Sequence, residues 1–488
     1  MKAVLVATIG TRDLMFQVSS GSWCNLGDDR MKDGDKFGEQ FEVLSDLCLG
    51  SKTYRQLTQH LLERIEIYRQ RIKPVIIGKL INDKAVDIDK IYLIGTNQNQ
   101  EVSEREKDTL YTCELIKNWV EHQYQHKIPV EVIHLGIDGT NPAHFEQMFA
   151  WWRNIWRNQI EIKINQLIWV CLKGGVGQTS EAARISGLSM FGERIQYFEF
   201  KSNNTVANRA GISSEYTGPF LGTNYLWDRT RQQALNLLER YDYAAVLKLL
   251  QPYHQQDTSG WSATPKLLKA GLTWNQGEFE TFLNQAKDAL SREQLYQGAS
   301  FWWQAYEEAY LAIIRLEQNN TTEAMFHSFR AVEGLLYMWA KEIFSQAVTD
   351  PPNKFPILSK SIIHKYPILK QEFTESSEIE LNLWRMRRLV EAIIPKVTYE
   401  QDFNVFWDNA RIARNNLFHR IDGLTEKQVF QAWGEDINNR KAWENRILSC
   451  LNLATGNNFK SLERASLFAS IHQRVKQAIE NYQPIAVK

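Results

Sequence analysis

The stretch QLIWVCLKGGVGQTS occupies residues 166–180 and indicates the fold of the N-terminal part of this 488-residue chain. An apolar run with the length of a buried strand is followed by a glycine-rich loop, and residues 179–191 continue with helical periodicity. The loop nearly matches a phosphate-binding loop of the Lys-Gly-Gly-x-Gly-Lys-Thr kind, but Gln178 stands at the lysine position. Backbone N–H groups at a helix start can still hold an anion, whereas hydrolysis of ATP or GTP would lack its cation. We therefore expect this loop to bind a phosphate-rich ligand.

Further apolar runs alternate with helix-period segments up to residue 201. Strands are predicted at 2–9, 91–96, 130–135, 166–172 and 194–201, and helices at 104–126, 144–159 and 179–191. This alternation predicts an α/β, Rossmann-like, doubly wound parallel sheet. Such sheets bind ligands at the carboxyl ends of their strands, so loops 8–13, 95–98, 136–141 and 173–180 are expected to surround one crevice.

The character of the sequence changes after residue 201. Residues 211–224 are rich in Gly, Ser and Thr, and from Trp227 onwards the sequence predicts helices alone. We expect a ligand-binding domain at residues 1–226 and an all-α domain at residues 227–488. Helical segments are predicted at 228–250, 280–297, 300–341 and 382–394, with a break at 349–353.

Composition excludes several classes of protein. Lys and Arg number 57, as do Asp and Glu, so any contact with nucleic acid must be local. The five cysteines have no metal-ligand spacing, and we expect neither a metal nor a cofactor. The sequence has no secretory pattern and no apolar run of membrane-spanning length, which predicts a cytoplasmic protein without a membrane partner.

The segment RNNLFH, residues 414–419, carries the candidate catalytic groups. An RNA phosphodiester can be cleaved without a metal when the neighbouring 2′-hydroxyl is the nucleophile. The enzyme must then stabilise charge on the phosphate, which Arg414 would do, and move protons, which His419 would do. Asn415 could hold the histidine or a phosphate oxygen in register.

Two other patterns have an ordinary structural interpretation. Arg55 and His60 repeat the arginine-to-histidine spacing inside a helix-period segment, and we interpret them as part of a solvated helix face. Trp151, Trp152 and Trp156 could stack bases, but their helical spacing favours a packed stripe.

The segment at Arg414 resembles the signature of the HEPN ribonucleases: Arg, usually Asn, then a few residues and His. Residues 326–336 resemble the first long HEPN core helix with its Arg-x-x-Glu element, here Arg330 and Glu333, although an ordinary helical ion pair fits them equally well.

The N-terminal part resembles the CARF domain, a Rossmann-like sensor of cyclic oligoadenylates. The resemblance assigns ligand binding to Thr8, Gly10, Thr11, Arg12, Asn97, Lys173, Gly174, Gly175, Gln178 and Thr179. The whole chain thus resembles the CARF-HEPN ribonucleases of type III CRISPR defence.

That resemblance implies an antiviral endoribonuclease that works as a homodimer. A cyclic oligoadenylate would bind across two CARF domains and allosterically activate a shared HEPN site, to which each chain gives one Arg and one His. Metal-independent cleavage of single-stranded RNA would leave 2′,3′-cyclic phosphates. Thr8 or Thr11 could also position the activator for slow self-limiting cleavage. A non-catalytic nucleotide-sensing scaffold and a P-loop-like switch ATPase remain the alternatives.

Overall fold

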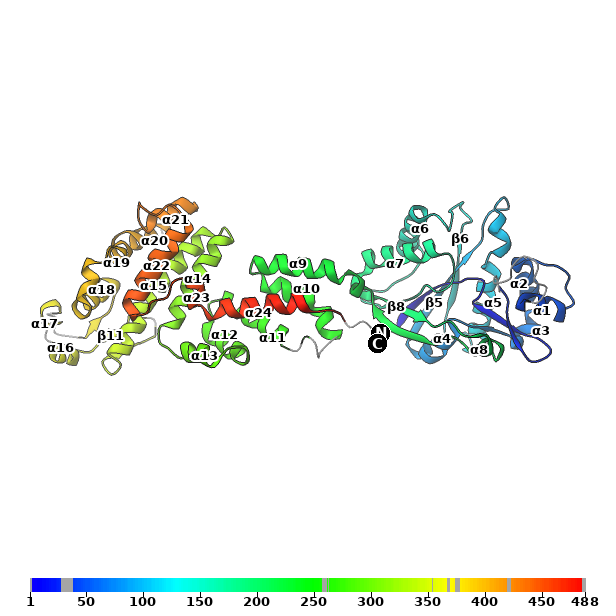
Figure 1. Ribbon diagram of the computed structural model, residues 1–488, viewed down its shortest axis with the longest axis horizontal. Helices are drawn as coiled ribbons and strands as arrows, with labels where there is room; N and C mark the ends of the chain where they lie inside the picture. Colours follow the sequence, from blue (N-terminus) through cyan, green and yellow to red (C-terminus); the bar gives the residue numbers. More distant parts are fainter. Residues whose placement is uncertain are drawn as a thin grey trace. The chain divides into compact units, whose positions relative to one another are not determined.

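The computed structural model describes residues 2–27, 38–256, 261, 263–352, 354–366, 369–373, 378–418 and 423–484. The chain divides into two compact units, Met1–Trp227 and Asp228–Lys488 (Figure 1). Each unit is described by itself below.

Unit 1 is built on a six-stranded mixed sheet. Its strands are β1 (Ala3–Thr8), β5 (Ile88–Thr96), β6 (Val130–Leu135), β7 (Ile168–Cys171), β8 (Ile195–Phe200) and β9 (Tyr216–Leu221). Their order is β6-β5-β1-β7-β8-β9, and the first five are parallel, which confirms the five predicted strands. The expectation that strands end near residue 201 is wrong, because β9 pairs antiparallel with β8.

The central strand β1 sends alternate side chains into two separate cores. Ala3, Leu5 and Ala7 belong to one core, and Val4 and Val6 belong to the other. A strand with both faces covered must be apolar at every position, which explains its continuous apolar run. The first core is completed by α2 (Tyr54–Glu63), α4 (Gly78–Lys84) and α5 (Leu110–Gln123), and the second by α6 (Phe145–Asn158) and α7 (Gly177–Phe191).

The helices of unit 1 largely follow their predicted ranges. The predicted helix at 104–126 is divided into a 3-10 turn, Ser103–Lys107, and α5. Trp151, Trp152 and Trp156 are at most 7% exposed in the core beneath α6, as the helical spacing predicted. A second, antiparallel sheet of β2 (Leu14–Gln17), β3 (Trp23–Asn25) and β4 (Ile72–Pro74) was not predicted.

Unit 2 is mostly helical. Its longer helices are α9 (Trp227–Glu239, which begins at the last residue of unit 1), α10 (Tyr243–Gln256), α11 (Thr264–Asn275), α14 (Trp303–Glu317), α15 (Thr321–Ile343), α18 (Leu383–Ile393), α22 (Arg440–Thr455) and α24 (Leu467–Asn481). The expectation of helices alone is wrong here too, because β10 (Val348–Thr349), β11 (Ile357–Leu358) and β12 (Ile379–Glu380) form a small antiparallel sheet. Two-residue strands are too short to show an alternating pattern.

Candidate functional sites

The topology of unit 1 creates a crevice between β1 and β7. From β1 the chain proceeds to β5 and β6 on one side and then returns to β7 and β8 on the other. The connections that follow β1 and β7 therefore diverge, and the carboxyl ends of these strands form the switch point at which open α/β sheets bind ligands.

Glycines allow the loops after β1 and β7 to touch. A Cβ atom at Gly174 would lie 2.4 Å from Asp13 Oδ2, 2.5 Å from Gly10 N and 2.5 Å from Thr8 O, so no larger residue fits. The Thr8 hydroxyl donates to Gly174 O at 2.6 Å, and Gly10 N donates to Asp13 Oδ2 at 2.6 Å. These contacts fix the two loops as one structure at the base of the crevice.

Two cavities flank this pair of loops. The larger, of about 720 Å³, is lined by residues from all four predicted loops, which confirms that they surround one crevice: Gly10 and Thr11 after β1, Thr96 and Gln98 after β5, Gly136 and Asn141 after β6, and Gly175 after β7. The smaller, of about 290 Å³, is lined by Arg12, Asp13, Lys173, Gly174, Lys201 and Asn203, among others. Its three cationic side chains, Arg12, Lys173 and Lys201, suit it to phosphate.

Four of the predicted ligand-binding residues have other contacts or positions. Thr8 and Thr179 are each 3% exposed, and the Thr179 hydroxyl donates to Pro142 O at 3.0 Å, so both hold loops together. The Asn97 side chain accepts a hydrogen bond from Arg55 at 3.0 Å. Gln178 is exposed in the first turn of α7 and belongs to the lining of neither cavity.

Arg55 has a role that the sequence interpretation missed. Its side chain is only 13% exposed and its Nη1 lies 2.7 Å from Oδ2 of the fully buried Asp108, so the expectation of a solvated helix face is wrong for this residue. The same carboxylate oxygen accepts from the backbone N–H of Gln98 at 2.6 Å. The pair anchors the loop after β5 that lines the larger cavity. Nothing local to either residue predicts a pairing across 53 positions.

Burial dominates the electrostatics at the base of the crevice. Asp13 is 1% exposed, and burial raises the pKa of its carboxyl from 3.8 to about 7, although the hydrogen bond from Gly10 opposes the shift. The Oδ1 atom of Asp13 has no hydrogen-bond partner within the part of the chain that the structure describes.

In unit 2, the Arg414 motif is held against α15. Arg414 lies on α20 (Arg411–Phe418), directly after a π-helical turn, Phe406–Ala410, a feature frequent at functional sites. Its Nη2 lies 3.5 Å from Glu333 Oε2, and its guanidinium lies over the Phe329 ring, 4.4 Å from the centroid. Phe329 and Glu333 are one turn apart on α15, so they orient the arginine together.

The suggested ion pair between Arg330 and Glu333 is not what the structure contains. Arg330 Nε lies 3.4 Å from Glu308 Oε1 on α14, while Glu333 contacts Arg414. Burial raises the pKa of the Glu333 carboxyl, and the charge of Arg414 partly opposes that shift. The helix that carries Arg-x-x-Glu is therefore the one that contacts the motif arginine.

Of the other two predicted residues of this motif, the structure describes Asn415 but not His419. Asn415 is half-buried on α20. His419 lies outside the described residues. The first glycine after the helix, Gly423, precedes α21 (Glu426–Ala432), which begins with a capping box from Thr425.

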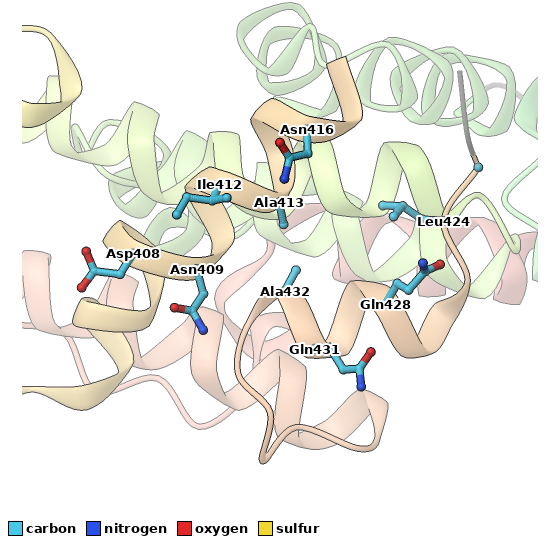
Figure 2. A pocket seen from close by; sticks show the side chains of 10 residues that line it. Asp408, Asn409, Ile412, Ala413, Asn416, Leu424, Gln428, Gln431 and Ala432 are labelled. Carbon is cyan, nitrogen blue, oxygen red and sulfur yellow. The ribbon is translucent and has the colours of Figure 1, made fainter. Parts of the chain in front are cut away.

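A groove of about 540 Å³ separates α20 from α21 (Figure 2). Asn409, Ile412, Ala413 and Asn416 form one wall at i, i+3, i+4 and i+7, and Leu424, Gln428, Gln431 and Ala432 form the other. Arg414 lies outside this series and contacts α15. Asp408 is the one charged residue among the described groove lining.

Other kinds of site were searched for within the described ranges. In those ranges no three His, Cys, Asp or Glu side chains are grouped so that they could hold a metal ion. None of the helices that the structure describes has the length and apolar character needed to span a membrane.

Comparison with solved structures finds a likeness over almost the whole chain. Enterococcus italicus Csm6, solved bound to cyclic hexa-2′-fluoro-hexa-dAMP, matches 98% of this chain and 100% of its own with a TM-score of 0.55. The two sequences are 12% identical, so the likeness establishes a Csm6-like fold alone. No protein-family model matches the sequence, and no curated protein matches it.

Proposed function

We propose that this chain is a CRISPR-associated antiviral endoribonuclease that a cyclic oligoadenylate activates. The observation that carries the proposal is the Csm6-like fold over 98% of the chain, with a neighbour solved in complex with a cyclic hexanucleotide analogue. In this proposal, the CARF-like crevice in unit 1 binds the activator and the HEPN-like motif in unit 2 cleaves the RNA.

Unit 1 would bind the activator. Its phosphates would lie against Arg12, Lys173 and Lys201 in the smaller cavity, and its nucleobases would enter the larger cavity. A ring with near rotational symmetry fits a two-fold homodimer, in which each protomer supplies one crevice. Binding would favour the dimer state that cleaves RNA.

Unit 2 would cleave single-stranded RNA. Arg414, oriented by Glu333 and Phe329, would bind the scissile phosphate, and Asn415 would hold a phosphate oxygen or the histidine. The 2′-oxygen attacks phosphorus and loses its proton, while the 5′-oxygen leaves and gains one, with His419 acting as acid or base. The products are a 2′,3′-cyclic phosphate and a 5′-hydroxyl. Each HEPN site would combine the motifs of two protomers.

The test is cleavage of a fluorescent single-stranded RNA in EDTA, with cyclic tetra-adenylate and cyclic hexa-adenylate added separately. We expect one ring to activate the wild type, and we expect Arg414→Ala and His419→Ala to abolish the activity. His60→Ala is the matched control, because His60 belongs to the second arginine-to-histidine spacing in the chain and should leave cleavage intact.

Two results would contradict the proposal. Activity that survives in both motif variants would place the chemistry elsewhere. Silence with both rings, combined with tight ring binding in calorimetry, would instead support a nucleotide-sensing scaffold.

A further inference from the structure

Helix α18 exposes an aromatic and basic face that the proposed catalytic motif does not use. Met386, Leu389 and Val390 are fully buried on one side of this helix. Trp384, Arg387, Arg388 and Glu391 follow one another at i, i+3, i+4 and i+7, on the other side. Trp384 is 59% exposed, although an indole is among the largest apolar groups a protein can bury.

Arg388 stacks on this tryptophan. Its guanidinium carbon lies 3.9 Å from the centroid of the Trp384 ring, close enough for a cation–π contact that holds the indole on the surface. The combination supplies a flat π surface next to a charge that can bind phosphate.

The same helix is tied to the element that carries the Arg414 motif. Arg387 Nε lies 2.8 Å from Glu391 Oε1, and its Nη1 lies 3.0 Å from Asp408 Oδ1. Asp408 belongs to the π-helical turn that leads into α20 and also lines the groove in Figure 2. An RNA strand bound on α18 would therefore lie on a helix that is ion-paired to the turn leading into the motif helix.

We propose that Trp384 and Arg388 form a base-stacking platform that binds the single-stranded RNA substrate beside the cleavage site. The inference rests on the RNA substrate proposed above. Stacking accepts any base, and the arginine contacts the adjacent phosphate, so the platform recognises unpaired RNA with little sequence preference. Charge complementarity favours this occupant: the three arginines of α18 stand against Glu391 on the same helix and Asp408, which leaves a net charge of +1 on a chain whose formal net charge is zero.

The experiment measures binding of a fluorescein-labelled single-stranded oligouridylate to the full chain by anisotropy. His419→Ala serves as the parent, so that the RNA stays intact. Adding Trp384→Ala should weaken binding about tenfold, Trp384→Phe should retain most of it, and Arg388→Lys should lose the planar stack and bind more weakly. Tyr296→Ala on α13 (Arg292–Gly298), which removes another exposed aromatic ring, should bind like the parent.

Three outcomes would overturn the inference. If the parent binds RNA and Trp384→Ala binds equally well, the platform does not contact the substrate. If Trp384→Ala dissociates the oligomer in light scattering, the face is a subunit contact. If the parent does not bind RNA, and the wild type does not cleave RNA with either ring, the proposed function itself fails. In active protein, a binding role predicts a raised KM with little change in kcat.

Discussion

Asp13 fixes the shape of a loop, but the charge of its buried carboxylate is unfavourable. Its carboxylate accepts from Gly10 N and so shapes the loop after β1, but the site that achieves this is almost dry. Glycine backbone surrounds the carboxyl in place of water, and the hydrogen bond from Gly10 is what opposes the effect of burial on the pKa of Asp13. The buried charge is therefore destabilised.

The stability of unit 1 should consequently fall as pH rises. The pKa of Asp13 is about 7 in the folded protein against 3.8 in the unfolded chain, so between about pH 4 and pH 7 the folded state holds the extra proton. The extra proton on Asp13 stabilises the folded state fully below about pH 4, and this stabilisation is lost above about pH 7. Its upper limit is on the order of 4 kcal/mol in the free energy of unfolding. Asp13→Asn keeps the hydrogen bond and should flatten this pH dependence in urea unfolding.

Glu307 in unit 2 provides the comparison. It is fully buried, and its pKa is raised from 4.5 to about 7 by burial, so it should give unfolding a dependence of the same sign. Glu307→Gln should alter the unfolding of unit 2 and leave the Asp13 effect in place. An unchanged pH slope for unit 1 in Asp13→Asn would show that this carboxyl titrates normally in the folded protein.

At the scale of elements, the close approach of the loops after β1 and β7 determines the shape of the crevice. Strands β1 and β7 are adjacent and parallel, and the backbones of the turns that follow them come close at Gly10 and Gly174. The hydroxyl of Thr8 closes this contact across 166 positions of sequence. The shape of the crevice is thus set by the two loops together, because the glycines leave room for the backbones to approach each other.

A methyl group at the meeting point should separate the loops. Gly174→Ala would bring its Cβ within 2.5 Å of two backbone atoms, which cannot be relieved by a side-chain rotation. We expect the free energy of unfolding of unit 1 to fall by about 1–3 kcal/mol, and binding of the cyclic oligoadenylate to weaken strongly in calorimetry. Gly177→Ala is the matched control three residues on, because its Cβ would meet no described atom within 4 Å. Equal behaviour of the two variants would refute this account.

At the scale of the whole molecule, each unit has cores of its own. The two clusters around β1 contain residues of unit 1 only, and the large cluster around α15 contains residues of unit 2 only. A segment with its own buried core can in principle fold alone.

We therefore expect the fragment Met1–Trp227 to fold cooperatively and to bind the activating ring, while cleaving no RNA. The fragment ends at Trp227, the last residue of unit 1. Thermal unfolding followed by circular dichroism, with and without each ring, would measure both properties through the stabilisation that a bound ligand gives. A fragment that is unfolded, or that melts at the same temperature with either ring, would contradict the expectation.

The sequence by itself determined the parallel strands of unit 1, the helices between them and the loops that surround the crevice. Those features depend on local periodicity and on strand order, which neighbouring residues encode. Tertiary structure decided the rest: the antiparallel β9, the two-residue strands of unit 2, and the partners of Arg55 and Glu333. Arg55 finds Asp108 across 53 positions and Glu333 finds Arg414 across 81. Such pairs form only when packed helices bring distant residues together, and no local pattern records them.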